Sequence, residues 1–376
     1  MFPRCPPPLR RALTAPLAVA LVGVLAACDS TPAPVLPTPS SVYACPPGQL
    51  QVEGATSESA MMNSYIVSYA ETCRNASTVV WTTSADSGRT SFVNGLVQVA
   101  TSESWLSNEE VAAAQRRCQQ NPPWHLPTTA SPVAIVFRLD GVTQLTLSPE
   151  TLAMIFSGQL NRWNDARIAR ENPGVALPNQ AIQVFYQNQP SGASEALGRY
   201  LARTAPLKWS PRNTTPNWRG QGQGRDRPED VASSVAGRSG SIGFVETATL
   251  GDPARRQADA AKLGQVGIDE GQGPLLPTQE ATSRALQRAR FLPGQESNDL
   301  RIDPASLSGD GAYPVVAVTY QIVCSRGLPV EVTSLGRDFL GFMINPQTQS
   351  GLPAIGRVPL PEELRRRTTE AVAAIR

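Results

Sequence analysis

Three short segments rich in Ser, Thr and Gly each precede a predicted helix, and together they could bind an anion. They are "GATS" at residues 54–57, "SADSG" at residues 84–88 and "PSGAS" at residues 190–194. The first N–H groups of a helix have no partner within the helix, so they can donate hydrogen bonds to an oxyanion, and nearby hydroxyl groups add further donors. The alternative is that these residues only cap their helices, as Ser, Thr and Gly commonly do.

Alternating strands and helices are expected to position these segments. Apolar stretches rich in β-branched residues predict strands at residues 77–84, 132–139, 182–186 and 315–324. Helical patterns lie between them, which is typical of an α/β fold with mainly parallel sheets. In such folds, ligands bind beyond the carboxyl ends of strands, at helix N-termini. Two polar spans, residues 217–230 and 251–304, are interpreted as long surface loops or insertions.

Several helix starts can be predicted from their capping residues. Ser107 followed by Glu110 three residues later forms a capping-box pattern. Ser148 precedes a proline, which is tolerated at the first helical position because its missing amide is not needed there. Either Ser191 or Ser194 can cap the helix that follows the third anion-binding segment.

The N-terminus predicts export and a lipid anchor. Residues 1–27 combine three Arg with a short apolar run, the pattern of an export signal. The tetrapeptide "LAAC" that ends at Cys28 resembles the lipobox of bacterial lipoproteins, in which the Cys is acylated. An ordinary secretory peptide with an incidental Cys is the alternative. The lipobox places the protein on the outer face of the bacterial cytoplasmic membrane, with the Pro-, Ser- and Thr-rich residues 28–42 as a tether.

Charge and length narrow the classes of protein further. The whole chain has a formal net charge of +2, to which residues 1–27 contribute three Arg and no acidic residue, so the remainder is close to neutral. Without a basic run, nucleic acid is not expected as a partner. The roughly 350 residues after the leader are enough for two domains.

Four cysteines remain after the leader, and an even number outside the cytoplasm predicts two disulfides. Three pairings are possible. We favour Cys73–Cys118, because both residues lie near the ends of predicted helices in the same half of the chain, which leaves Cys45 to pair with Cys324. A metal site is disfavoured, because the chain has no CxxC spacing and a single His.

Residues 147–202 resemble the phosphate-binding lipoproteins that serve high-affinity phosphate ABC transporters. The block contains "IFSGQLNRWND", "NPGVALPNQAIQV" and "QNQPSGASEAL", in the order of that family's helix end, connecting strand and anion loop. Further similar stretches are "GATSESAMM", "TSADSGRTSFVNGLVQVATSES" and "AGRSGSIGFVETA". The resemblance covers most of the chain after Gly54.

The resemblance implies a type II periplasmic-binding-protein fold, with two α/β lobes that are joined by hinge strands and close on a ligand. Lobe 1 would comprise residues 43–136 and 314–376, and lobe 2 residues 137–313. The implied function is capture of phosphate, or a related oxyanion, for an ABC permease in the cytoplasmic membrane. The protein is expected to act as a monomer without any cofactor.

The family's binding residues transfer by position to both lobes. Thr56 and Ser57 would supply a hydroxyl and an amide, and Ser87, or else Ser84, would supply a second hydroxyl. Glu103 matches the family's binding Asp. A carboxylate that faces an oxyanion can only accept a proton carried by that ion, so Glu103 would favour hydrogen phosphate over fully ionised sulfate.

The anion loop of the second lobe departs from the family pattern. Ser191 and Gly192 match the loop's Ser and Gly, whereas the family's Thr falls on Ala193. The family's Arg and Asp fall on Gln187 and Gln189, so one charge-assisted contact to the ligand is lost. Such a contact is worth about 1.5–3 kcal/mol.

Two interpretations of this loss stay open. Arg89, beside the second anion-binding segment, could supply the missing charge, or it could be an ordinary solvated residue. Alternatively, the protein keeps the fold with a degenerate site and serves as a sensor or interaction module. A hydrolase is disfavoured, because His125 is the only imidazole and the chain has no G-x-S-x-G motif.

Overall fold

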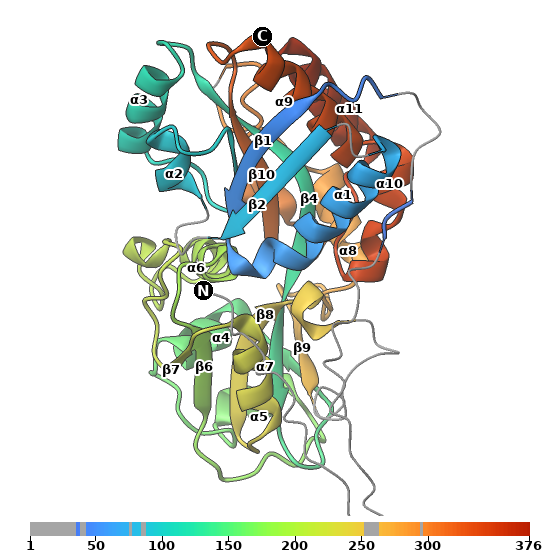
Figure 1. Ribbon diagram of the computed structural model, residues 1–376. Helices are drawn as coiled ribbons and strands as arrows, with labels where there is room; N and C mark the ends of the chain where they lie inside the picture. Colours follow the sequence, from blue (N-terminus) through green and yellow to red (C-terminus); the bar gives the residue numbers. More distant parts are fainter. Residues whose placement is uncertain (1–34, 38–42, 75–76, 84–87, 252–262, 294–295) are drawn as a thin grey trace, which may run out of the picture. The chain divides into compact units, whose positions relative to one another are not determined.

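The computed structural model describes residues 35–37, 43–74, 77–83, 88–251, 263–293 and 296–376 (Figure 1). The predicted leader, Cys28 and most of the predicted tether lie outside the described residues. The described residues form one compact unit. In the described part of the chain, no helix is both long enough and apolar enough to cross a membrane.

The strands form one continuous ladder with the order β2-β1-β3-β10-β4-β8-β6-β7. β1 is parallel to β2 and β3, whereas β10 is antiparallel to both β3 and β4. β8 is antiparallel to β4 and parallel to β6, and β9 pairs with β4 and β5. The strand bounds are β1 Gly48–Gly54, β2 Ser77–Thr83, β3 Val99–Ser102, β4 Pro123–Arg138, β5 Gln144–Leu147, β6 Gln183–Gln187, β7 Gln223–Arg225, β8 Ser241–Glu246, β9 Gly264–Ile268 and β10 Val316–Cys324.

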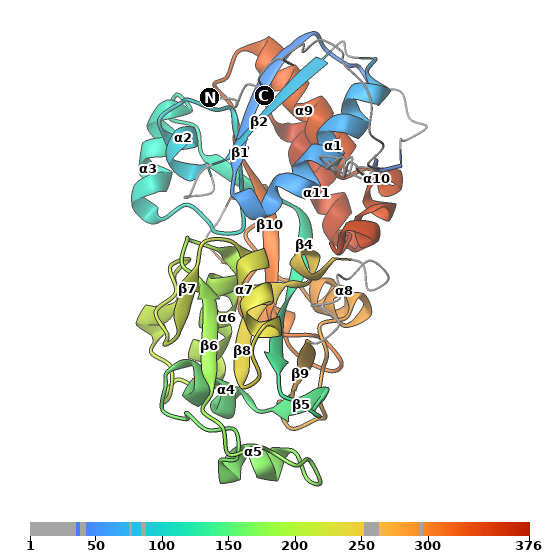
Figure 2. The same ribbon diagram turned by 60° about the horizontal axis from the view of Figure 1, so that its bottom comes forward.

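The α-helices pack around this ladder in two groups, one around β1–β3 and the other around β6–β8 (Figures 1 and 2). Their bounds are α1 Ser59–Thr72, α2 Arg89–Val93, α3 Asn108–Arg117, α4 Pro149–Phe156, α5 Ala166–Glu171, α6 Gly192–Thr204, α7 Pro228–Ala236, α8 Gln279–Gln287, α9 Val330–Met343, α10 Pro346–Ser350 and α11 Glu362–Ala374. Short 3-10 helices are η1 Thr56–Glu58, η2 Pro211–Asn213, η3 Thr247–Leu250, η5 Pro304–Leu307 and η6 Leu352–Ile355.

β4 joins the two halves of the sheet. Its residues 123–132 pair with β10, and its residues 133–138 pair with β8. Both β4 and β10 run from one group of helices into the other (Figures 1 and 2). Two separate hydrophobic cores lie on either side, one around Phe156, Trp163 and Phe244 and the other around Tyr69 and Phe339. The predicted two-lobed α/β fold is thereby confirmed, and the exact lobe boundaries stay a prediction.

The three capping predictions are confirmed. Ser107 and Glu110 form the full capping box of α3, and Ser148 caps α4. Ser191 caps α6 by accepting the N–H of Ser194 at 3.1 Å.

Three predictions about loops and strands were wrong in part. The span 217–230 contains β7 and the start of α7, and the span 251–304 contains β9 and α8. β4 begins at Pro123, nine residues before the predicted strand start at 132.

Both disulfides form, but with a different pairing from the one that we favoured. Cys45 bonds to Cys73, and Cys118 bonds to Cys324. The reason lies in the packing, because Cys73 belongs to the core that contains Tyr69, whereas Cys118 and Cys324 share a separate cluster around Phe92.

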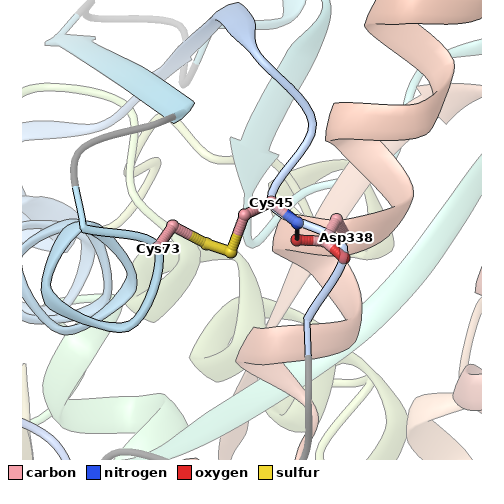
Figure 3. Close-up of side chains that lie close together, drawn as sticks. All are labelled: Cys45, Cys73 and Asp338. Atoms are coloured by element: carbon pink, nitrogen blue, oxygen red, sulfur yellow. Dashed lines mark hydrogen bonds between the residues drawn. A yellow bond between two sulfur atoms is a disulfide. The ribbon is translucent and has the colours of Figure 1, made fainter.

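Figure 3 shows the first disulfide beside the carboxylate of Asp338. This carboxylate accepts the backbone N–H groups of Ala44 and Cys45 at 3.0 and 3.2 Å, and the hydroxyl of Tyr69 at 2.8 Å. The two sulfurs and the carboxylate are close enough to suggest a metal site. Sulfurs that are bonded to each other are not thiolate ligands, so the cluster is structural.

Candidate ligand-binding site

The first predicted anion-binding segment follows β1 and forms the turn into α1. Thr56 opens the short helix η1, and the backbone carbonyl of Ser57 accepts a hydrogen bond from Arg357 at 3.4 Å. The side chain of Glu58 closes this turn by accepting the N–H of Ala55 at 3.1 Å. The segment therefore sits at the carboxyl end of a parallel strand, where a ligand site is expected.

In the second segment, Ser84 and Ser87 lie outside the described residues. Gly88 is the N-cap residue of α2 and has a φ of 70°, and a Cβ added there would lie 2.2 Å from the carbonyl oxygen of Glu53. The next residue, Arg89, forms an ion pair with Glu110 of α3 at 3.3 Å. The guanidinium of Arg89 is therefore paired with a residue of α3. The arginine that lies beside Glu103 is a different one.

The third segment meets the first half of the molecule at Gly192. Gly192 and Ala193 are the buried first residues of α6. A Cβ added at Gly192 would lie 2.2 Å from Oε2 of Glu103 and 2.3 Å from its Cβ. Two residues that the sequence assigned to different lobes are therefore in direct contact, 89 positions apart in the chain.

Gln187, by contrast, ends β6 and is aligned with Arg225 of β7. Its side chain is half-buried. The structure thus brings Glu103 into contact with Gly192, and places Gln187 at the end of β6, beside the edge strand β7.

A buried arginine that sequence reasoning missed completes the site. Arg357 is only 2% exposed, and its Nη1 lies 3.2 Å from Oε1 of Glu103 and 3.1 Å from Oε2 of Glu246. The same nitrogen donates to the hydroxyl of Thr319 at 3.3 Å. Arg357 is 254 residues from Glu103, and no motif in the sequence connects them.

Three carboxyl groups surround this one guanidinium, and burial makes their ionisation costly. Burial and the charge of Glu103 raise the pKa of Glu58 well above its usual value. The same two causes raise the pKa of Glu246 to about 8. Burial alone would lower the pKa of Arg357, but the neighbouring carboxylates raise it above its usual value, so Arg357 stays charged.

A second set of contacts joins the two halves beside Glu103. The hydroxyl of Ser104 donates to Glu195 of α6, which also forms an ion pair with Arg199. The guanidinium of Arg199 lies 4.0 Å from the ring centroid of Trp105. These contacts and Gly192 border a cavity of about 70 Å³. A water needs only about 10–15 Å³, so the cavity has room for a few water-sized groups. Its walls include the apolar Leu307 and Val316, and Arg357 is not among its lining residues.

Both ring nitrogens of His125 form hydrogen bonds within the fold. Nδ1 lies 2.7 Å from Asp299, and Nε2 accepts the backbone N–H of Leu106 at 3.1 Å. Burial lowers the pKa of His125, although Asp299 opposes the shift. The ring is fully buried and has no nitrogen left to act as a general base.

Comparisons with known proteins agree with this architecture. The model of a PBP superfamily domain matches residues 41–347. A phosphate-binding protein PstS 3 of Mycobacterium leprae is 29% identical over 329 residues, which are 87% of this chain and 86% of that protein. A phosphate-binding protein PstS 2 of Mycobacterium tuberculosis is 28% identical over 347 residues, 90% of each chain.

Solved structures give the same fold. A phosphate-binding protein from Stenotrophomonas maltophilia has a TM-score of 0.60 and 20% identity, covering 86% of this chain and 93% of that one. A high-affinity periplasmic phosphate-binding protein bound with phosphate has a TM-score of 0.65 and 20% identity, covering 85% of this chain and 92% of that one. Because the family model matches most of the two-lobed fold, the chain belongs to the PBP superfamily.

Proposed function

We propose that this protein captures phosphate, or a closely related oxyanion, between its two lobes and delivers it to an ABC importer without catalysis. The observation that carries the proposal is the contact between Glu103 and Gly192. It places a carboxylate against the first residues of α6, whose N–H groups favour negative charge. An oxyanion that carries a proton satisfies both groups, since it can donate to Glu103 and accept from α6. The names of the relatives support phosphate as this oxyanion.

The proposed ligand set comprises the residues carried over from the family, with Arg357 added behind Glu103. Two of its members, Ser57 and Ser191, have polar groups already engaged in the fold. The carbonyl of Ser57 accepts from Arg357, and the hydroxyl of Ser191 caps α6. Ser57 would therefore contribute its amide, and Ser191 would hold the helix end in place for the N–H groups that follow.

Export and anchoring through acylated Cys28 belong to the same proposal and rest on the sequence pattern of residues 1–28. A Cys28→Ala variant is expected to lose incorporation of radioactive palmitate and to leave the membrane fraction. Retention of the label would show that acylation occurs elsewhere. The protein is proposed to act as a monomer, with lobes at the boundaries predicted from the sequence.

Isothermal titration calorimetry on the purified full-length protein tests the proposed function. Phosphate is expected to bind, and sulfate, which has no proton to donate near neutral pH, is expected to bind much more weakly or not at all. Equal binding of both anions would contradict the role of Glu103. Binding of neither anion would favour the alternative, a binding-protein-like lipoprotein that works as a sensor or interaction module.

A further inference from the structure

The buried group formed by Arg357, Glu58, Glu103 and Glu246 has more ionisable side chains than a simple ion pair needs. Several of their polar atoms have no hydrogen-bond partner among the described residues, namely Arg357 Nε, Glu58 Oε1 and Glu246 Oε2. The last of these lies within ion-pair distance of Arg357, at 3.1 Å, but is not aligned for a hydrogen bond. Buried polar atoms without a partner are rare in native proteins and call for an explanation, of which a functional role is one.

The backbone around Arg357 is fixed independently of these charges. The N–H of Val358 donates to Ala130 of β4 at 2.8 Å, and the hydroxyl of Thr129 donates to the carbonyl of Val358 at 2.9 Å. The carbonyl of Arg357 itself accepts from Gln279 of α8 at 3.0 Å. The backbone that carries the side chain of Arg357 is therefore held in place by hydrogen bonds to β4 and α8.

The two oxygens of Glu103 face different partners. Oε1 lies 3.2 Å from Nη1 of Arg357, whereas Oε2 lies beside Gly192. We propose that Arg357 is a specificity-determining positioning residue, which holds Glu103 by one oxygen so that the other accepts the proton of a protonated oxyanion. This inference rests on the proposed function and assigns a selectivity role to a residue outside the predicted ligand set.

The geometry explains why the arrangement needs Arg357. Oε1 of Glu103 has Arg357 as its ion-pair partner at 3.2 Å, and Glu246 lies 3.1 Å from the same guanidinium nitrogen. Without the guanidinium, Glu103 would lose the contact that fixes its orientation, and Oε2 would no longer be held towards Gly192. The site would then lose the acceptor that distinguishes an ion that carries a proton from fully ionised sulfate.

The same group couples ligand binding to protons through Glu246. Its charged neighbours are Glu103 at the end of β3, Arg357 before α11, Glu58 on η1 and Glu229 on α7. Because the pKa of Glu246 is raised to about 8, this carboxyl group is mainly neutral below that pH. Above it, Glu246 gains a negative charge that repels an incoming anion, so affinity falls as pH rises.

The first test compares phosphate and sulfate affinities, measured by calorimetry, for the full-length wild type and Arg357→Gln. The phosphate affinity of the variant is expected to be at least tenfold lower than that of the wild type. The ratio of its phosphate affinity to its sulfate affinity should also be smaller. Arg357→Lys, which keeps the charge, should restore part of that preference. Arg138→Gln, at the far end of β4, removes a half-buried arginine that bonds to the carbonyl of Ala236 and serves as the matched control. An unchanged preference in Arg357→Gln overturns the inference.

The second test does not depend on the folding of Arg357→Gln. The phosphate affinities of the wild type and of Glu246→Gln are measured from pH 6 to pH 9.5, and the wild-type value is divided by the variant value at each pH. The ionisation of phosphate affects both proteins equally, so it cancels in this ratio. The ratio is expected to fall by up to about tenfold per pH unit above pH 8, and parallel profiles overturn the proton coupling. If the wild type binds no phosphate at any pH, both the proposed function and this inference are refuted. If the wild type binds and the variants match it, only the inference fails.

Discussion

Adding a single methyl group at Gly192 tests whether the two lobes must meet at this point for the ligand to be held. In Gly192→Ala, the new Cβ would lie 2.3 Å from Cβ of Glu103. Non-bonded carbons prefer about 3.5–4.0 Å, so the gap must widen by about 1.2 Å. The carboxylate of Glu103 can rotate away, but its Cβ is fixed to the backbone. The backbone segments on either side must therefore separate.

Overpacking of this kind costs about 1–3 kcal/mol. If the cost falls on the closed, ligand-holding state, phosphate affinity drops by roughly 5- to 150-fold, at 1.4 kcal/mol per tenfold change. Calorimetry with phosphate measures the loss, and thermal unfolding of the ligand-free protein shows whether the fold is intact.

Gly341→Ala is the matched control for this substitution. Gly341 lies within α9, and a Cβ there would have no atom within 4 Å. Ala in a helix interior is more favourable than Gly by about 0.5–1 kcal/mol, so this variant should be slightly more stable, with unchanged affinity. Wild-type phosphate affinity in Gly192→Ala would refute the view that the ligand-holding state requires the contact between Glu103 and Gly192.

Three other predictions address stability and affinity. Replacing Cys118 and Cys324 by Ser opens a loop of 206 residues, and the chain-entropy model predicts a loss of about 5 kcal/mol in urea unfolding. Because burial lowers the pKa of His125 below its usual 6.5, the unfolded state binds the extra proton first. The free energy of unfolding should then fall as pH drops below 6.5, and His125→Gln should show a shallower fall. The double change Gln187→Arg with Gln189→Asp should tighten phosphate binding about 10- to 100-fold in calorimetry, by adding one charge-assisted contact, and unchanged affinity would count against placing the ligand near β6.

Local patterns in the sequence predicted individual helices and strands, whereas the two-lobed arrangement was implied by the family resemblance. Capping residues such as Ser107 and Ser148 act within one helical turn, so the sequence places them well. β4 was predicted too short because its first part, "PWHLPTTASP", is rich in proline, which cannot donate to a strand ladder. The structure accommodates this with a shift in register opposite Pro127, between Thr319 and Tyr320 of β10.

Only part of the site could be predicted from the sequence, for a similar reason. Glu103 and Gly192 lie in segments that resemble the family's binding segments, and both were predicted as ligand-binding residues on that resemblance. Arg357 follows a short 3-10 helix in a loop with no pattern of its own. Its importance comes from a contact across 254 residues. The disulfide pairing was wrong for the same physical reason, since proximity between hydrophobic clusters cannot be read from spacing along the chain.

The placement of the two interlobe contacts on the strands gives them different mechanical roles. Val358, next to Arg357, pairs with Ala130 of β4, and Glu246 of β8 pairs with Val133 of the same strand. The Arg357–Glu246 ion pair is therefore held by neighbouring positions on one strand, and a hinge motion would change its length little. Glu103 and Gly192 share no strand pairing, so their contact would open first. A ligand captured beside this contact would meet charges on Arg357 and Glu246 that are already in place. The ionisation of Glu246 would therefore affect the empty protein as well as the ligand-bound one.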